Sequence, residues 1–156
     1  MLSTLTKLDI SDNQIKARAC RQLCHHCRLL TRLQDLPEQL SDLCNLETLW
    51  GFKNKVGPAL PEWFGKMTAL TDLNLFNNAI MRLPESMSGL VNMEQLNLAS
   101  NKIIRVPSLD GMVNLKRLAL YMNRISQMAD LRTQSKLEKL EIYQNILPQL
   151  PVCCAM

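Results

Sequence analysis

The apolar residues of this chain recur at a fixed spacing, with polar residues between them. Within each copy of the pattern, apolar positions four and six alternate with polar ones, which is the period of a β-strand. A less regular stretch follows, so the sequence predicts short strands that are each followed by a return segment. The string Leu-x-x-Leu-x-Leu-x-x-Asn-x-Ile appears, with some substitutions, in six copies whose first positions are Leu5, Leu46, Leu70, Met93, Leu115 and Leu137.

The spacing of the copies predicts how these units are assembled. The last four steps are 24, 23, 22 and 22 residues long, and self-similarity at such a period is the signature of a repeat architecture. A single unit cannot bury its own leucines, so neighbouring units are expected to stack. With adjacent strands about 4.8 Å apart, stacking produces a parallel sheet that lines a concave wall. We expect one domain that spans residues 1–156.

Two copies match a known pattern most closely. They are Leu70-Thr-Asp-Leu73-Asn-Leu75-Phe-Asn-Asn78-Ala-Ile80 and Leu115-Lys-Arg-Leu118-Ala-Leu120-Tyr-Met-Asn123-Arg-Ile125. These copies resemble the leucine-rich repeat family, and the resemblance covers residues 37–150. It implies an α/β fold, a right-handed β-α superhelix shaped like a horseshoe arc, with about six to seven repeats. Its sheet is parallel and concave, and its convex side carries irregular, 3-10 or short helical segments.

The return segments resemble two subclasses of that family. Leu-Pro pairs at residues 36–37, 60–61 and 83–84 resemble the intracellular Ras-suppressor-like subclass. The two copies that are followed by the 22-residue steps lack the pair and resemble the shorter 22-residue class that includes a phosphatase regulatory subunit. The resemblance therefore implies partners such as a phosphatase, a small GTPase or a larger multi-subunit assembly.

The ninth position is an asparagine in every copy. It falls where the chain turns off the sheet with its backbone amides facing inward, and a buried Asn side chain can satisfy such groups. We expect the loss of one of these side chains to cost about 1 to 3 kcal/mol. Copy two departs from the pattern at Gly51, which removes a core side chain and weakens its strand. The predicted structural ladder consists of Asn13, Asn54, Asn78, Asn101, Asn123 and Asn145.

Residues 16–35 interrupt the repeat, because the 41-residue step from Leu5 to Leu46 is too long for one unit and too short for two. A helix is the preferred interpretation, and a decayed copy that starts at Leu23 is the alternative. The segment has no acidic residue before Asp35, and its cations make 16–32 either a solvated helix face or a dock for RNA, anionic lipid or an acidic partner. The helical stripe would consist of Cys20, Leu23, Cys24, Cys27 and Leu30, and the basic residues are Lys16, Arg18, Arg21, Arg28 and Arg32.

Neither end of the sequence shows a recognisable cap. Solenoids need terminal units with a polar outer face, yet this sequence starts almost inside its first strand and ends at Leu-Pro-Gln-Leu-Pro-Val-Cys-Cys-Ala-Met. We therefore expect the domain to be part of a longer protein, or to have its ends covered by neighbours in an assembly.

Composition narrows the class of protein. A hydrophobic content of 47% with 21% charged residues is that of a packed soluble domain. No apolar run approaches the roughly 18 residues of a membrane helix, so membrane insertion is not expected, and the first residues lack the features of a secretion signal. We interpret the six cysteines as reduced thiols. A cytoplasmic location follows as the prediction.

The cysteines also raise the question of a cofactor. Cys20-Arg-Gln-Leu-Cys24-His-His-Cys27 has the spacing with which radical S-adenosylmethionine enzymes hold an iron–sulfur cluster. Those enzymes resemble longer, partial βα barrels, whereas most of this chain is committed to repeats. Zinc is a second alternative, since Cys and His are its ligands, but these cysteines share a stripe with leucines and are interpreted as core residues. No phosphate-binding loop, nucleophile elbow or H-E-x-x-H motif occurs, so we predict no metal, cofactor or enzyme activity.

Aromatic residues gather on the predicted wall. Strand alternation directs positions five and seven away from the leucine core, and five of the seven aromatic residues fall there. Exposed rings at this density indicate a binding ridge. The alternative is that they simply cover neighbouring backbone. The predicted anchors are Trp50, Phe52, Phe76, Tyr121 and Tyr143.

The charges of the wall help to choose a class of partner. We count 5 basic and 7 acidic side chains there, whereas a nucleic-acid groove concentrates cations. We therefore predict a non-catalytic protein interaction module or scaffold within a larger complex. It would bind a partner protein on the wall, with Asp72, Arg117 and Lys139 setting the register. The alternative function is an RNA- or anionic-surface-associated protein that uses residues 16–32.

Overall fold

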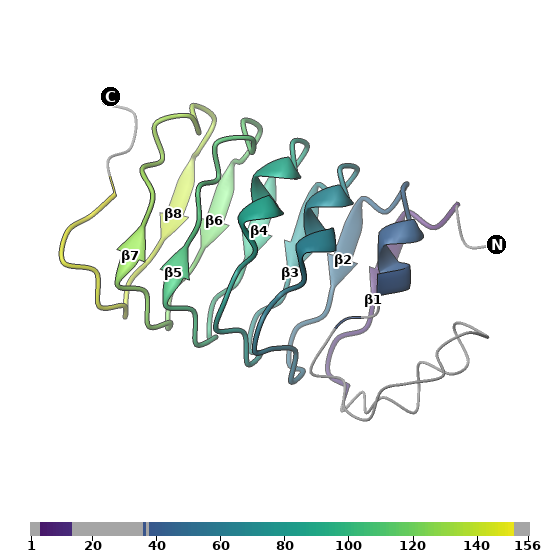
Figure 1. Ribbon diagram of the computed structural model, residues 1–156, viewed down its shortest axis with the longest axis horizontal. Coiled ribbons are helices and arrows are strands. Elements are labelled where there is room, and N and C mark those ends of the chain that lie inside the picture. Colours follow the sequence, from purple (N-terminus) through teal and green to yellow (C-terminus); the bar gives the residue numbers. More distant parts are fainter. Residues whose placement is uncertain (1–3, 14–35, 37, 152–156) are drawn as a thin grey trace.

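A computed structural model of the chain describes residues 4–13, 36 and 38–151. The helix or decayed copy predicted within 16–35 lies outside the described residues, and so does the cysteine cluster. Six short strands form one parallel sheet in the order β1-β2-β3-β4-β6-β8 (Figure 1). This confirms the predicted stacking of one strand per copy. The strands are β1 (Lys7–Asp9), β2 (Thr48–Trp50), β3 (Asp72–Asn74), β4 (Gln95–Asn97), β6 (Arg117–Ala119) and β8 (Lys139–Glu141).

The register of the sheet follows the repeat. Each strand pairs with the next at equivalent positions, as in Leu49 with Leu73 and Leu73 with Leu96. The same holds for Leu8 and Leu49, although 41 residues separate copies one and two in the sequence. The 41-residue step between copies one and two therefore leaves the register of the strands unchanged.

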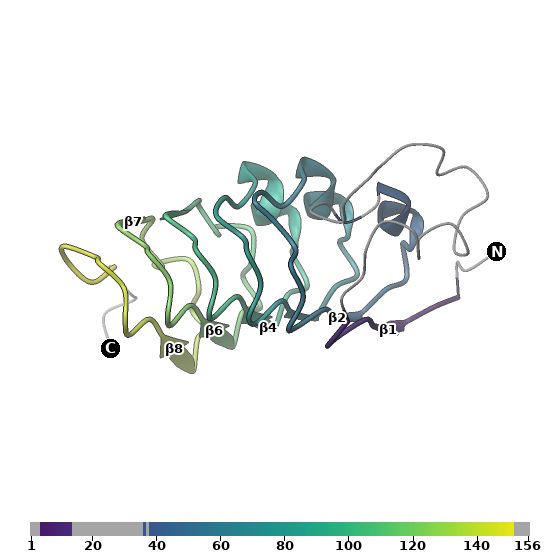
Figure 2. The ribbon, with the colours of Figure 1, turned by 90° about the horizontal axis from the view of Figure 1, so that it is seen from below.

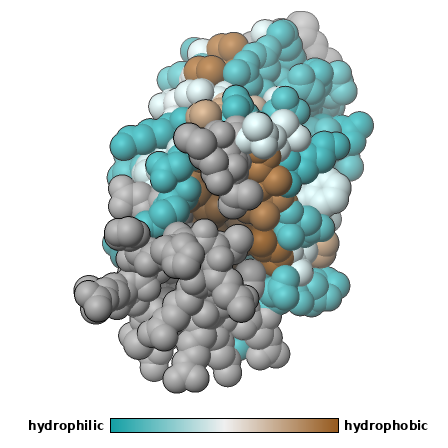
Figure 3. All heavy atoms as spheres, turned by 90° about the vertical axis from the view of Figure 1, so that its right-hand side faces the viewer, coloured by the Kyte–Doolittle hydropathy of each residue, from teal (hydrophilic) through white to brown (hydrophobic). Residues whose placement is uncertain are grey.

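The core is a stack of equivalent apolar side chains. Leu49, Leu73, Leu75 and Leu98 are completely buried, as the alternation of inward and outward positions requires. Figure 3 looks onto the β1 side of the molecule and shows apolar side chains gathered toward the middle, with hydrophilic ones around them. Because each layer touches only the next, burial depends on neighbouring copies rather than on contacts within one copy.

Side chains of the neighbouring copies fill the space that Gly51 leaves in the core. A Cβ atom added there would lie 3.2 Å from Leu75 Cδ2 and 3.6 Å from Ile10 Cγ1. The equivalent side chains of the two neighbouring copies therefore close over the space that the glycine leaves. The Gly51 amide still donates to the carbonyl of Asn74 at 2.8 Å, so the sheet continues through this copy.

Among the described residues, three 3-10 helices form, and they lie on the side of the solenoid opposite the sheet (Figure 2). They are η2 (Glu38–Asp42), η3 (Glu62–Lys66) and η4 (Glu85–Gly89). The helices η3 and η4 begin directly after Pro61 and Pro84, whose rings fix φ near the value that helix entry needs. They pack backbone to backbone, because a Cβ on Gly89 would lie only 2.5 Å from the Gly65 carbonyl oxygen. Glycine is required at this close approach.

The copies without a Leu-Pro pair use a different return segment. Arg105–Val106 (β5) and Gln127–Met128 (β7) pair as a two-stranded parallel sheet. Isolated bridges join Ala59 to Arg82 and Arg82 to Arg105. The convex side therefore changes along the solenoid from 3-10 helix to extended chain, and this extended part was not predicted.

The eighth position of every copy adopts a left-handed backbone conformation, with φ between 53° and 56°. None of these residues is a glycine, so each carries a steric cost of about 1 kcal/mol. In the first five copies a hydrogen bond from the amide of this residue to the next copy offsets that cost, as where the Ser100 amide donates to the Tyr121 carbonyl at 2.9 Å. The turn that leaves the sheet is therefore stabilised by the next copy. The left-handed residues are Asp12, Lys53, Asn77, Ser100, Met122 and Gln144.

The asparagine side chains link consecutive copies. In copy four, Asn101 Nδ2 donates to the carbonyls of Leu75, Leu98 and Ala99 at 2.9, 3.0 and 3.2 Å. Its Oδ1 accepts the Ile80 amide at 3.0 Å. The side chain therefore satisfies three carbonyls and one amide, whereas the sequence suggested mainly amides. Equivalent bonds between copies are made by Asn78, Asn123 and Asn145.

The first two asparagines make fewer of these bonds. Asn13 is exposed and donates to Ile10 and Ser11 of its own copy. Asn54 Nδ2 reaches the Ile10 carbonyl at 3.0 Å, but its Oδ1 is buried and has no donor within the described part of the chain.

Replacing Asn101 by alanine tests the ladder. Asn101→Ala should lower the free energy of unfolding by about 3 kcal/mol, because it strands buried carbonyls of two copies. Urea denaturation with linear extrapolation measures the change. Asn92→Ala is the matched control, since this exposed side chain donates one hydrogen bond to the Thr68 carbonyl at 2.9 Å. Equal losses in the two variants would contradict a special role for the ladder.

Candidate functional site

The outer face of the six-stranded sheet is formed by positions three, five and seven of each copy, and we call it the sheet wall. Its strands lie side by side on one side of the solenoid, away from the 3-10 helices (Figure 2). Side chains at these positions point opposite to the buried leucines because successive residues of a strand alternate in direction. All five predicted aromatic anchors belong to this wall.

Three of the rings form a continuous row. Tyr121 and Tyr143 stack with their centroids 4.8 Å apart and their planes at 6°, and Phe76 lies 6.4 Å from Tyr121 at 45°. Phe76 and Tyr121 follow β3 and β6, in the copies on either side of copy four, where Ala99 is completely buried. The two rings therefore lean toward each other over Ala99, which is the backbone-covering role that the alternative interpretation assigned to them.

The row nevertheless leaves a large aromatic surface open. Tyr143 is 56% exposed and Trp50 is 40% exposed, while Phe52, Phe76 and Tyr121 are half-buried. Trp50 Nε1 donates to Asp72 Oδ1 at 3.3 Å, which joins copies two and three. The indole is therefore held in one orientation by a residue that was predicted to contact the partner.

The charged residues of the wall differ in their surroundings. Lys139 Nζ lies 3.1 Å from Glu141 Oε1 on its own strand. Arg117 is exposed between Gln95 and Lys139 in the register of the sheet. It makes no ion pair with another residue that the structure describes. Of the three residues predicted to set register, Asp72 and Lys139 are already engaged, and Arg117 is available to a ligand.

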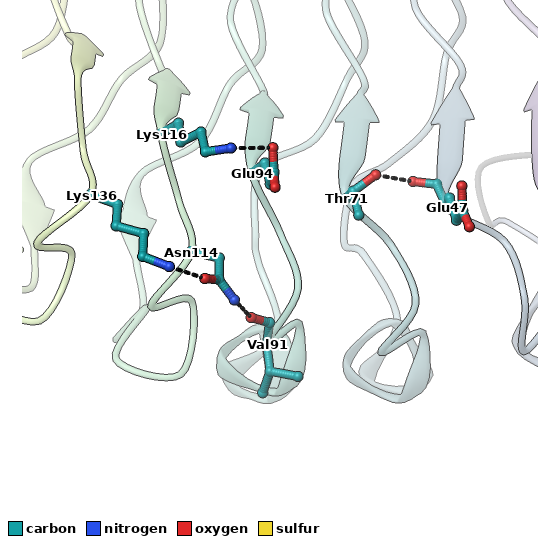
Figure 4. Close-up of polar contacts among 7 residues, drawn as sticks. All are labelled: Glu47, Thr71, Val91, Glu94, Asn114, Lys116 and Lys136. Atoms are coloured by element: carbon teal, nitrogen blue, oxygen red, sulfur yellow. Dashed lines mark hydrogen bonds and ion pairs between the residues drawn. The ribbon is translucent and has the colours of Figure 1, made fainter.

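A second line of polar contacts runs below the strands (Figure 4). Lys116 Nζ reaches Glu94 Oε2 at 2.7 Å, and Thr71 Oγ1 donates to the Glu47 carbonyl at 3.1 Å. Asn114 Nδ2 donates to the Val91 carbonyl and Lys136 Nζ donates to Asn114 Oδ1. These side chains bridge neighbouring copies, so their polar groups serve the stacking of the solenoid. Sequence reasoning missed them because the partners are more than twenty residues apart.

The described residues offer little for metal chemistry. They contain no group of three or more His, Cys, Asp or Glu side chains that could hold a metal ion. Cys44 is a free, exposed thiol. The candidate cluster of Cys20, Cys24 and Cys27, and the basic segment 16–32, lie outside the described residues. In the same part of the chain, no helix has the length and apolar character needed to cross a membrane.

Comparison with known proteins places the repeats. Residues 54–103 match the leucine rich repeat family. The chain is similar to the ectodomain of the plant membrane receptor kinase GASSHO1/SCHENGEN3 from Arabidopsis thaliana, solved in complex with CASPARIAN STRIP INTEGRITY FACTOR 2. The identity is 26% and the TM-score 0.75, over 92% of this chain and 16% of that chain.

Two further structures are similar. The PEPR1-AtPEP1 structure matches at 26% identity with a TM-score of 0.66, over 72% of this chain and 17% of that chain. A leucine-rich repeat protein of Leptospira interrogans matches at 20% identity with a TM-score of 0.60, over 96% of this chain and 46% of that chain. At that identity the likeness shows the fold alone. The chain spans less than a fifth of the length of each of the first two matched chains.

The environment of Tyr121 provides a test of the aromatic row. Burial raises the pKa of this phenol above its usual 10.0, and the neighbouring Tyr143 and Glu141 raise it further, while Lys139 lowers it. The folded protein therefore favours the neutral phenol. Its contribution to stability is fully present below pH 10.0 and is lost as the pH rises through the raised pKa.

Two variants at residue 143 separate these causes. Tyr143→Phe and Tyr143→Ala each leave Tyr121 as the one tyrosine in the chain, so phenolate absorbance during an alkaline titration reports it alone. Both variants remove the phenolate charge, but the phenylalanine ring still covers Tyr121. We expect a pKa above 10.0 in Tyr143→Phe and a lower pKa in Tyr143→Ala. The same pKa in both would show that the rings do not stack.

Proposed function

We propose, from the premise that this chain is a leucine-rich repeat solenoid, that it is a non-catalytic interaction module whose sheet wall binds a segment of a partner protein. The observation that carries the proposal is the open row of aromatic rings that runs across several copies. Leucine-rich repeat domains typically bind proteins and typically lack catalytic activity. The rings of the aromatic row are only partly buried, so part of their surface remains open to a partner.

The form of the row suits a protein ligand. Aromatic side chains dominate the energetics of protein interfaces because they bury much apolar surface. Stacking of Tyr121 on Tyr143 and the hydrogen bond from Trp50 to Asp72 restrict these side chains before any partner arrives. Less conformational entropy is then lost on binding. An extended segment lying across the strands would contact several rings at once.

Charged residues of the wall would orient the partner segment. Arg117 has no ion pair within the described residues, and it lies on β6, two strands away from Asp72 on β3. We infer that an acidic side chain of the partner binds Arg117 and that Lys139 can exchange Glu141 for the same partner. Asp72 would contribute a second polar contact beside Trp50. These three residues would fix the register of the segment, whereas the rings would supply most of the affinity.

The first two similar structures are consistent with partner binding by this fold. Each was solved with a second component, CASPARIAN STRIP INTEGRITY FACTOR 2 in one and AtPEP1 in the other. This chain spans less than a fifth of either matched chain, so the analogy extends to the binding of a partner and not to the identity of the ligand.

We further propose that the partner is intracellular, and that it is a phosphatase, a small GTPase or a subunit of a larger assembly. The Leu-Pro pairs support this proposal because they resemble the Ras-suppressor-like subclass, and Pro61 and Pro84 each precede a 3-10 helix. The exposed free thiol of Cys44 suits a reducing compartment. Co-purification from cell extract, followed by identification of the bound protein, distinguishes the three classes.

Truncation of a central ring tests the proposed surface. Phe76→Ala should weaken binding of the co-purified partner by about 1 to 3 kcal/mol, because it removes apolar contact area from the middle of the row. Titration monitored by calorimetry measures the dissociation constant. Val113→Ala is the control, since Val113 is 48% exposed and lies outside the wall. Unchanged affinity in Phe76→Ala, or an equal loss in Val113→Ala, would contradict the assignment of the site to the wall.

A further inference from the structure

A second exposed surface follows the asparagine ladder, where the chain leaves the sheet. Position ten of copies two, four and five is basic, and so is position thirteen of copies three and four. All five side chains are exposed. We call this surface the basic flank, and it consists of Lys55, Arg82, Lys102, Arg105 and Arg124.

Stacking of the copies brings these cations together. Arg82 and Arg105 are paired by a β-bridge. The Lys102 amide donates to Ile80 at 2.8 Å, and the Arg124 amide donates to Ile103 at 3.0 Å, so consecutive copies remain one strand spacing apart. Residues more than twenty positions apart in the sequence therefore line up in two columns across four copies.

The flank is poor in compensating acid. Arg105 Nη2 lies 3.4 Å from Glu85 Oε1. In the part of the chain that the structure describes, Lys55, Arg82, Lys102 and Arg124 make no ion pair. The four cations of the flank without an ion pair carry a charge of +4, which equals the formal net charge of the whole chain. Neighbouring like charges repel, and an acidic ligand relieves that repulsion.

An apolar side chain lies within the cations. Ile104 is 47% exposed and is flanked in sequence by Ile103, which is buried, and by Arg105. Met81, its counterpart in the neighbouring copy, is half-buried. The flank therefore contains an exposed apolar side chain that lies between two of its cations, Lys102 and Arg105, in the sequence.

The absence of aromatic rings from the basic flank favours a polypeptide over single-stranded nucleic acid as its ligand. Surfaces that bind single-stranded nucleic acid combine cations with rings on which bases stack. Here five of the seven aromatic residues lie on the sheet wall, and the other two, Trp63 and Phe64, stack on each other in η3 at 4.9 Å. A polypeptide that carries both carboxylates and an aliphatic side chain matches the flank in charge and in polarity.

We propose that the basic flank is a second binding surface, which takes an acidic segment of a partner protein with an aliphatic side chain packed on Ile104. The carboxylates pair with Lys102 and Arg124 on either side. This surface is separate from the sheet wall, so the proposal stands or fails independently of the function proposed for the aromatic row.

A fluorescent peptide of alternating glutamate and leucine, titrated with the purified protein in an anisotropy assay, tests the proposal. We expect saturable binding that weakens with added salt. The double variant Lys102→Glu, Arg124→Glu should lose at least tenfold in affinity, and Ile104→Ser should weaken binding several-fold at unchanged charge. The matched charge control is Lys7→Glu, Lys66→Glu, which changes the net charge equally at exposed residues elsewhere. Phe76→Ala should bind the peptide like the unchanged protein.

Three outcomes would overturn the proposal. An equal loss in the control double variant would show that net charge alone, and not the basic flank, accounts for binding. Unchanged binding in Ile104→Ser would remove the apolar contact that singles out a polypeptide. Tighter binding of a single-stranded oligonucleotide, or of vesicles containing phosphatidylserine, than of the peptide would assign the flank to another class of ligand. Circular dichroism of each variant distinguishes a lost contact from a lost fold.

Discussion

Closure of each copy onto the next by the asparagine at position nine is the interaction on which the rest of this structure depends. Asn101 and Asn123 bind carbonyls of two copies and accept an amide from the preceding one. They do so at the point where a left-handed residue turns the chain off the sheet. Equivalent bonds recur through the later copies, and the strands keep one register even between copies one and two, where 41 residues separate them and Asn54 makes fewer of these bonds. The leucines can then form continuous buried columns.

That closure also determines where function can reside. Position four is buried in the central strands, and positions six and nine serve the core and the ladder there. In the described part of the chain, the side chains at positions three, five and seven of each copy, and at positions ten and thirteen, are at least partly exposed, apart from Ala99 and Ala119. The first set carries the aromatic row around Tyr121, and the second carries the basic flank around Ile104. Two surfaces of different chemistry thus arise on one scaffold, because each is a column of outward positions repeated along the stack.

The predictable and unpredictable parts of the molecule differ in how local their causes are. Alternation within each copy was enough to predict the strands and to place Trp50 and Tyr143 on the wall. The left-handed turns were missed, since Lys53 and Met122 carry no signature of such a backbone; their cost is offset by a bond to the next copy. The pairing of β5 with β7, the hydrogen bond from Trp50 to Asp72 and the closure over Ala99 likewise depend on neighbours about twenty residues away, which a single copy does not reveal.

Site-specific photo-crosslinking in the co-purified complex tests the central claim, that the sheet wall is the surface that contacts the partner. A benzoylphenylalanine residue is placed at position 121 on the wall, and in a separate protein at position 113 on the return path, and the crosslinked peptides are identified by mass spectrometry. We predict strong crosslinking to one segment of the partner from position 121 and none from position 113. Crosslinks from position 113 alone would contradict the account, because the partner would then bind the solenoid without using its aromatic row.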